Sequence, residues 1–336
     1  YDMGGQAWQN TELAVNMWLW YQFLRSGRSD IFRMARAMTE HTSEVDTYHI
    51  GEYARLGSRH NVVHWGCGCK ECRINMAGLH KYYYYLTGDE RTGDIMDEAA
   101  DSDYAVAGLD PMRAYYPPDS RFKAHVRFGP DVMAFCSDWF TYYERHLDEK
   151  YKNKLIKTLD FFKKGHRFVL SGVYGYNPEN TEYIDFAIDP GSHFMLCFGN
   201  PYVWYEIAKA FDDDLILEYM MDLGQFYGAN EKDREFRNKK CEEWGLKDIH
   251  FGRFNHSAYN VGVSAMAAKF RNDEELKEEV IEKIFDDDWL DMPLVHHKIT
   301  SAHKELVETL GISTNAVGQW VTNTLMALVF IGDDIK

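Results

Sequence analysis

The feature that most constrains the fold is a short polar turn that recurs about every sixty residues. Its six copies are SGRSD at 26–30, TGDE at 87–90, HLDE at 146–149, FDDD at 211–214, RNDE at 271–274 and IGDD at 331–334. Successive copies are separated by 61, 59, 64, 60 and 61 residues. A fixed period of this length indicates one structural unit that is repeated along the chain.

Each turn lies between two segments that have helical patterns of different character. The segment before the turn is apolar nearly all round, as in VMAFCSDWFTYY (132–143), which predicts a helix that is buried on several sides. The segment after the turn is charged and has apolar residues at helical spacing, as in DEKYKNKLIKTLDFFKK (148–164). Each unit is therefore expected to contain an inner helix, a tight turn, an outer helix and a long loop.

Inner helices surrounded by outer helices predict an all-α fold, an (α/α)6 six-hairpin toroid that forms a single domain over residues 1–336. An open α-solenoid is the alternative, but its repeats are usually shorter, at about 34–47 residues. The chain starts with YDMGG rather than with an initiator Met, and it stops just after the sixth turn. We therefore expect a fragment that lacks the sixth outer helix.

The composition argues against several kinds of partner. A formal net charge of −16 disfavours a nucleic-acid-binding surface. No apolar run approaches the ~18 residues that a membrane span needs. Aromatic residues make up 15% of the chain, and those in loops are suited to stacking on sugar rings, with a large aromatic core as the alternative explanation. The six cysteines do not form a disulfide framework, which favours a reducing compartment without fixing the location.

The long loops are expected to carry the chemistry. In a toroid of this kind they all lead into the N-termini of the inner helices, whose free N–H groups and partial positive charge favour an anionic ligand. Eleven of the fourteen histidines fall in or beside these loops. A concentration of histidines at one end of a ring points to a ligand-binding or catalytic site there.

The stretch SRHNVVHWGCGCKECR (58–73) allows three interpretations. A zinc site would use His60, His64, Cys67, Cys69 and Cys72, but this order of ligands is not a standard zinc motif. A redox role would need a neighbouring βαβ pattern, which the sequence lacks. We favour the wall of a pocket, with the cysteines packed at the entrance of a helix that starts near Lys70. No cofactor is then expected, and zinc is the minority alternative.

The segment DTYHIGEYARLGSRHNVVHWGCGCKECRINMAGLHKYYYYLTGDERTGD (46–94) resembles the toroid domain of the YetA-like exo-rhamnogalacturonan lyases. GGQAWQNTEL (4–13) and DPMR (110–113) are similar to the same family. The resemblance is most specific over the first third of the chain. It implies a polysaccharide lyase that acts on pectin, with β-sandwich domains flanking the toroid.

Lyase chemistry defines the residue types to look for. In β-elimination a base removes the C5 proton of a uronate, an acid protonates the leaving O4, and a positive group neutralises the carboxylate. Arg127 or Arg253, helped by Asn61, are our candidates for the carboxylate. The expected proton-transfer groups are His60, His64, His125, Tyr48 and His49. The expected sugar-binding residues are Trp65, Tyr116, Tyr174, Tyr176 and His256.

Two other functions remain open from the sequence. A glycoside hydrolase would need two carboxylates on either side of the scissile bond. The acidic residues near loop–helix junctions that would supply them are Asp2, Asp46, Asp131, Asp185 and Asp189. Asp131 and Glu71 could instead stabilise helix N-termini. The last alternative is a non-catalytic toroid that binds an oligosaccharide or polysaccharide.

Overall fold

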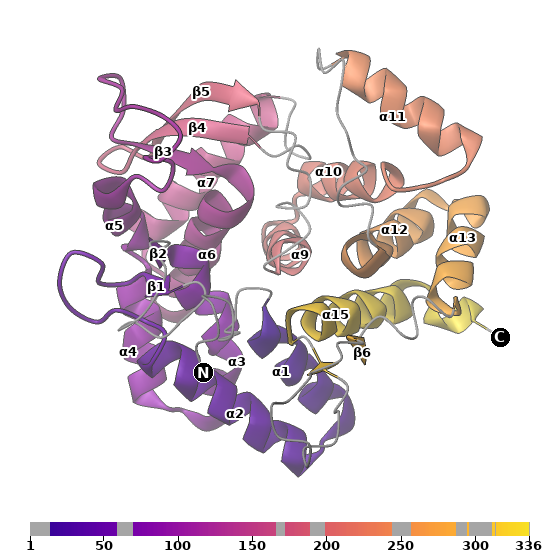
Figure 1. The fold of residues 1–336 in the computed structure, drawn as a ribbon, viewed down its shortest axis with the longest axis horizontal. Helices are drawn as coiled ribbons and strands as arrows, with labels where there is room; N and C mark the ends of the chain where they lie inside the picture. Colours follow the sequence, from indigo (N-terminus) through magenta and orange to yellow (C-terminus); the bar gives the residue numbers. More distant parts are fainter. Residues whose placement is uncertain are drawn as a thin grey trace, which may run out of the picture. The chain divides into compact units, whose positions relative to one another are not determined.

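The computed structural model describes residues 14–58, 70–165, 172–188, 199–243, 257–286, 294–295, 311–312 and 314–335. The chain forms two compact units, Tyr1–Tyr219 with Ile249–Phe251, and Met220–Asp248 with Gly252–Lys336. Helices dominate both units (Figure 1).

The predicted helical hairpins are present at the predicted turns. In the first unit they are α1 (Val15–Ser26) with α2 (Ser29–Glu44), α3 (Ala77–Thr87) with α4 (Glu90–Ala99), and α6 (Met133–His146) with α7 (Glu149–Lys164). A two-residue turn joins α9 (Asn200–Phe211) to α10 (Asp214–Gln225). The boundary between the two units falls within α10, after Tyr219. In the second unit α12 (Ser257–Arg271) pairs with α13 (Glu274–Ile284), and α15 (Thr314–Ile331) precedes the sixth turn.

The hairpin turns share one backbone design. The residue after each inner helix is left-handed, with φ between 51 and 68° at Gly27, Gly88, Leu147, Asp212 and Asn272. In four of these turns the next residue is an aspartate that accepts a backbone N–H bond from the outer helix. The bonds are Asp89 to Thr92, Asp148 to Lys150, Asp213 to Ile216 and Asp273 to Leu276. A left-handed C-terminal residue followed by an N-capping aspartate ends one helix and begins the next within two residues.

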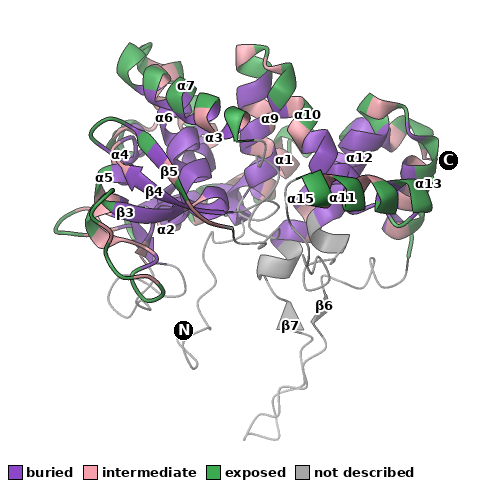
Figure 2. Cartoon of the chain, turned by 90° about the horizontal axis from the view of Figure 1, so that it is seen from above, coloured by how far each residue is buried: buried purple, intermediate pink, exposed green. Residues whose placement is uncertain are grey.

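Burial separates the inner from the outer helices, as the sequence predicts. Residues 133–141 of α6 and 260–268 of α12 are buried without interruption, whereas α7 and α13 alternate between buried and exposed positions (Figure 2). In the first unit α3 contacts both α1 and α6, and α6 contacts α9. In the second unit α12 packs against α15, where the Gly262 N–H donates to Asn323 Oδ1 over 3.3 Å.

A polar network lies among the inner helices of the first unit. Lys81 Nζ donates to Glu206 Oε2 over 2.5 Å, and the Tyr82 hydroxyl donates to Glu206 Oε1 over 2.7 Å. The Tyr21 and Tyr82 hydroxyls are 3.0 Å apart. Burial raises the pKa of both tyrosines well above the usual value, so both hydroxyls stay protonated. The network therefore ties α1, α3 and α9 together.

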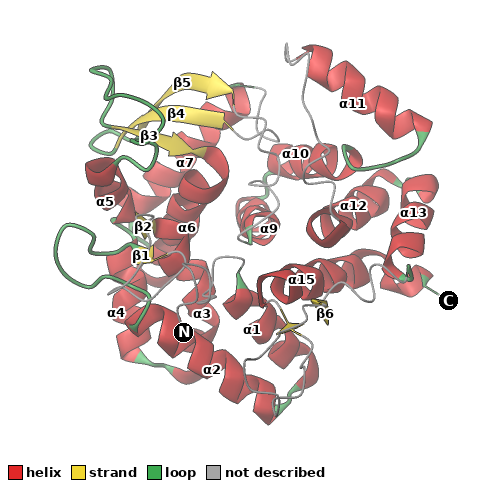
Figure 3. Cartoon of the chain, in the orientation of Figure 1, coloured by secondary structure: helices red, strands yellow, loops and turns green. Residues whose placement is uncertain are grey.

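The long loops contain more structure than the sequence analysis predicts. β3 (Ala124–Arg127), β4 (Gly172–Asn177) and β5 (Glu182–Ile188) form an antiparallel sheet in that order, beside α5 (Ser102–Leu109) and α7 (Figure 3). Segments 111–131 and 172–193 are therefore not simply loops. Three further elements are the helix α11 (Glu231–Glu243) and two short strand pairs, β1 (Gly57–Ser58) with β2 (Lys70–Glu71) and β6 (Leu294–Val295) with β7 (Gly311–Ile312).

The approach to α3 also differs from the prediction of a helix that starts near Lys70. Lys70 lies in β2, Cys72–Asn75 form a 3-10 turn, and α3 begins at Ala77. None of the described helices is long and apolar enough to span a membrane.

Candidate functional site

A histidine–aspartate pair is the most distinctive polar arrangement on the described sheet. His125 lies on β3 and is fully buried, with its Nδ1 2.8 Å from Asp110 Oδ2. The other oxygen of Asp110 accepts the N–H of Met112 over 3.0 Å, which fixes the orientation of the carboxylate. A carboxylate at Nδ1 favours the tautomer that leaves the lone pair on Nε2. His125 Nε2 is buried and has no hydrogen-bond partner within the described part of the chain.

Asp110 is held in an uncommon backbone conformation. It follows α5 with φ 50° and ψ 94°. A positive φ costs energy for a residue with a side chain, and such residues cluster at functional sites. The conformation brings the carboxylate to His125, so the geometry of the pair is maintained at the expense of local backbone energy.

Aromatic rings enclose His125 on the outer face of the sheet. The Tyr116 ring stacks on the imidazole with centroids 5.3 Å apart, and Phe122 and Phe186 meet it edge to face at 4.8 and 4.5 Å. Opposite His125 on β4 stands Gly175, where a Cβ would meet the Phe122 ring at 2.1 Å. The glycine therefore lets Phe122 lie flat over the strand. Tyr116 and Phe186 are half-buried, whereas Phe122 is buried, so these two rings are the parts of the enclosure that solvent reaches.

Arg127, two residues along β3, is already paired with carboxylates. Its Nε lies 2.8 Å from Asp131 Oδ2, and its Nη2 lies 3.1 Å from Glu71 Oε2. Glu71 also forms an ion pair with Arg73, and Glu71, Arg73 and Asp131 are buried. Two arginines and two carboxylates thus form a balanced buried network. This geometry argues against the expected role of Arg127 in neutralising a uronate carboxylate, because its charge is compensated within the protein.

The tyrosines of β4 do not offer stacking surfaces. Tyr174 and Tyr176 are buried at 4% and 0% exposure. The Tyr176 hydroxyl donates to Asp103 over 2.7 Å, and the Tyr174 ring packs edge to face on Phe162 at 4.8 Å. Because residues two apart on a strand point to the same face, both rings enter the core beneath the sheet. The expectation that they stack on sugar rings fails, since it assumed a loop at this position.

Tyr48 and His49 follow α2 and have different neighbours. The Tyr48 ring meets Tyr53 at 5.6 Å, with Lys70 Nζ 5.0 Å from its centroid. His49 Nε2 lies 3.7 Å from Glu44 Oε2, and its Nδ1 lies 3.4 Å from an Arg91 nitrogen. His49 therefore contacts the outer helices α2 and α4, whereas Tyr48 faces the segment that leads into α3.

Several predicted residues belong to segments outside the described part of the chain. His60, Asn61, His64, Trp65, Arg253 and His256 lie outside the described residues, as do Cys67 and Cys69 of the zinc alternative and Asp2 and Asp189 of the hydrolase alternative. Cys72 is buried, with its Sγ 3.9 Å from the carbonyl oxygen of Asp131, and burial raises the pKa of its thiol well above the usual value. No cluster of three metal-ligating side chains occurs among the residues that the structure describes.

Of the predicted site residues, the described structure brings His125 and Tyr116 into contact and places Arg127 on the same strand. The sequence analysis did not select Asp110 as a site residue. The available signal was the motif DPMR (110–113), in which Asp110 is the first residue. Asp46 is buried near His41 at 3.5 Å, Asp131 is bound to Arg127, and Asp185 is exposed on β5. The described carboxylates of the hydrolase alternative therefore have separate surroundings.

Repeated helical hairpins, each with a buried inner helix and an amphipathic outer helix, define the class of α/α toroid domains. The family model for the PcRGLX-like protein C-terminal alpha/alpha toroid domain matches residues 1–336, and the chain belongs to this family. This confirms the predicted toroid class and the resemblance to YetA-like proteins. The chain is 43% identical over 339 residues to the "Uncharacterized protein YetA" of Bacillus subtilis (strain 168). The match covers 100% of this chain and 39% of that relative.

Proposed function

We propose that this toroid domain acts on rhamnogalacturonan-type pectin and cleaves it by β-elimination next to a uronate. Membership of the PcRGLX-like family supports the carbohydrate substrate. The observation that carries the reaction type is the pair of Asp110 and His125, because elimination needs a base whose lone pair is held in position.

In the proposed step His125 Nε2 removes the C5 proton of the uronate. The electrons of the C–H bond form the C4–C5 double bond, and O4 leaves with the electrons of the C4–O4 bond and receives a proton from an acid. Asp110 stabilises the imidazolium that forms, as a carboxylate does in other histidine–aspartate pairs. The aromatic enclosure excludes water from Nε2, so one of the two half-buried rings, Tyr116 or Phe186, must move aside for the substrate to reach the base.

Ultraviolet absorbance tests the reaction type. The product of elimination has a double bond conjugated to the carboxylate and absorbs, whereas the product of hydrolysis does not. We expect absorbance to rise when the natural full-length protein is incubated with rhamnogalacturonan oligosaccharides. New reducing ends without absorbance would show a hydrolase, and neither signal would favour a toroid that only binds sugar.

Two variants test the base. His125→Ala should lower kcat by about 10²–10⁴-fold, the usual contribution of a general base, and Asp110→Asn should lower kcat through the wrong tautomer. His146→Gln is the matched control, because His146 also contacts an aspartate, with Nε2 2.9 Å from Asp97 Oδ1, but lies next to the hairpin turn at the end of α6. Elimination at the wild-type rate in His125→Ala that keeps its thermal stability would exclude His125 as the base.

A further inference from the structure

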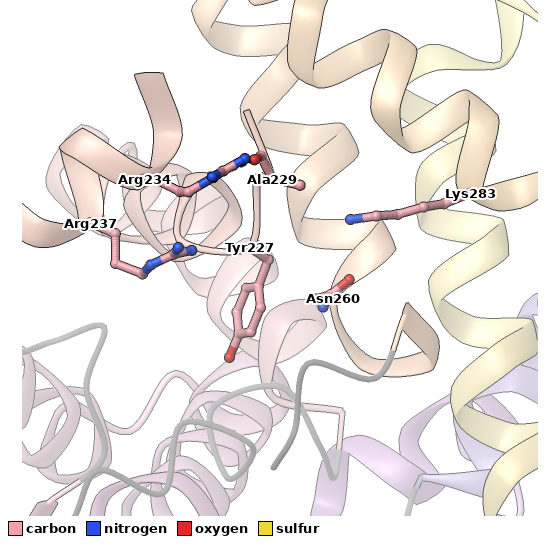
Figure 4. A pocket seen from close by; sticks show the side chains of 7 residues that line it. Tyr227, Ala229, Arg234, Arg237, Asn260 and Lys283 are labelled. Atoms are coloured by element: carbon pink, nitrogen blue, oxygen red, sulfur yellow. Dashed lines mark hydrogen bonds between the residues drawn. The ribbon is translucent and has the colours of Figure 1, made fainter. Parts of the chain in front are cut away.

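The second unit contains a cavity whose lining residues all belong to that unit. Its volume is about 340 Å³, at the lower end of the range for small-molecule sites. It is bounded by the segment after α10, by α11, by the first turn of α12 and by the last turn of α13 (Figure 4). The lining residues are Tyr227, Gly228, Ala229, Arg234, Arg237, Asn260 and Lys283.

Three cationic side chains line this cavity. Arg234 and Arg237 lie three residues apart on α11, so they share one face of the helix. Arg234 Nε donates to the carbonyl oxygen of Ala229 over 2.7 Å, and Arg237 Nη1 donates to that of Phe226. These bonds orient the two guanidinium groups. The acceptor of Arg234 is a neutral carbonyl oxygen, so this bond does not compensate the charge of Arg234.

Lys283 approaches the cavity from α13, on the side opposite the arginines (Figure 4). Burial lowers the pKa of Lys283, although the carboxylates of Glu279 and Asp233 act in the opposite direction. The cost of burying the ammonium therefore exceeds what these two carboxylates offset. A bound anion would relieve this penalty.

Two carboxylates, Glu279 and Asp233, lie near the cavity and partly offset the charge of Lys283. Glu279 on α13 accepts the N–H groups of Ala229 and Asn230 over 2.8 and 2.9 Å and so anchors the segment that forms one wall. Asp233 on α11 is fully buried; its Oδ2 accepts from Asn230 Nδ2, and its backbone N–H donates to Asn230 Oδ1, each over 2.8 Å. Burial raises the pKa of Asp233. Both carboxylates are thus held by hydrogen bonds in the wall of the cavity, whereas three cationic side chains line it.

Asn260 supplies an independent sign of a ligand. It lies in the first turn of α12, is 1% exposed, and lines the cavity. Neither its amide nitrogen nor its amide oxygen has a hydrogen-bond partner among the described residues. A buried polar group left unpaired costs about 1–3 kcal/mol. A ligand that both accepts and donates hydrogen bonds would satisfy both atoms.

We propose that this cavity binds a uronic acid unit, with the carboxylate held between Lys283 and Arg234 and a ring hydroxyl paired with Asn260. The two cations and the unpaired amide define a small anion that also carries hydroxyl donors. The choice of a uronic acid among such anions rests on the proposed function. The cavity would hold one or two sugar units.

Calorimetric titration of the natural full-length protein tests the site with three probes. Galacturonate should bind, whereas galactose, which has the same ring without the carboxylate, should bind at least about tenfold more weakly. Equal affinity for galactose would overturn the role of the carboxylate. Binding of inorganic phosphate without binding of galacturonate would overturn the assignment to a sugar acid.

Three variants locate the binding. Lys283→Met and Arg234→Met should each lower the affinity for galacturonate by about tenfold or more. Lys269 is an exposed lysine on α12, and Lys269→Met should leave the affinity unchanged. Asn260→Leu should lower the affinity for galacturonate while keeping or raising the thermal stability, because it removes an unpaired amide. Undiminished affinity in Lys283→Met and Asn260→Leu would show that galacturonate binds elsewhere. This titration requires no turnover, so its failure is distinguishable from failure of the absorbance assay.

Discussion

Asp138 in α6 accepts a hydrogen bond from the backbone N–H of Ala77, the first residue of α3, over 2.7 Å. The two residues are 61 positions apart, which is one period of the repeat. The other carboxylate oxygen of Asp138 accepts from the Ser102 hydroxyl over 2.8 Å, and the side chain is fully buried. One inner helix therefore caps its neighbour, which satisfies a helix N-terminus in the core without exposing it to water.

Replacing this cap should destabilise the fold. Asp138→Ala leaves the Ala77 N–H and the Ser102 hydroxyl unpaired, so we expect a loss of about 2–4 kcal/mol in the free energy of unfolding, measured with urea. Burial raises the pKa of Asp138 well above its usual value. Asp138→Asn keeps an oxygen that can accept the Ala77 N–H, and the Ser102 hydroxyl can turn to accept from the amide, so this variant should lose only about 1 kcal/mol. Equal losses in the two variants would contradict a capping role.

Arg127 should prove to be structural. Arg127→Met leaves Glu71 and Asp131 as buried carboxylates with less compensation, and we expect a loss of about 3–5 kcal/mol in the free energy of unfolding. Arg121→Met removes an exposed ion pair with Asp119 and should unfold at the same urea concentration as the wild type. If Arg127→Met instead kept full stability and lost only uronate binding, the sequence-based role of Arg127 would be restored.

His80 should make stability depend on pH. It is buried in α3, its Nε2 lies 3.2 Å from Asn75 Oδ1, and burial lowers its pKa from 6.5 to about 4. Between pH 4 and 6.5 the unfolded chain binds a proton that the folded chain does not, so stability rises with pH across this window and is constant above it. The contribution lost at low pH is up to about 3 kcal/mol, at 1.36 kcal/mol per pKa unit.

The comparison with His80→Gln isolates this contribution from the other titrating groups. The unfolding free energy of the wild type minus that of His80→Gln should become more positive as the pH rises from 4 to 6.5. A difference that stays constant with pH would mean that His80 titrates normally in the folded protein.

The third hairpin turn should gain stability from a glycine. Leu147 has φ 54° at the position that glycine occupies in the first two turns, and its side chain is 72% exposed. Leu147→Gly removes the steric cost of the left-handed conformation without loss of core packing, so we expect a gain of about 1 kcal/mol in urea unfolding. The reverse change, Gly88→Leu, should lose a similar amount. A loss of stability in Leu147→Gly would show that the leucine makes a contact that offsets its backbone strain.

The helical hairpins could be predicted from the sequence. Residues within one hairpin are close along the chain, so the turn at Gly88 and Asp89, the apolar character of α6 and the amphipathic pattern of α7 are local properties that the sequence displays directly. The spacing of the turns then gives the number of helical hairpins, and no distant contact is needed to recognise them.

The candidate sites were decided by tertiary structure. His125 stood out as a histidine in a long loop, but its partner Asp110 is identified only because β3 returns beside the end of α5. The sequence predicts an exposed loop for Tyr174 and Tyr176. In the structure β4 pairs with β3 and β5, and both rings point into the core. Asn260, Arg234 and Lys283 come from three helices, and their shared cavity arises from packing between segments far apart in the sequence. Local sequence patterns predict the helices and turns. The pairing of charged groups and the burial of polar groups depend on contacts between residues far apart in the sequence, which the spacing of residues along the chain does not reveal.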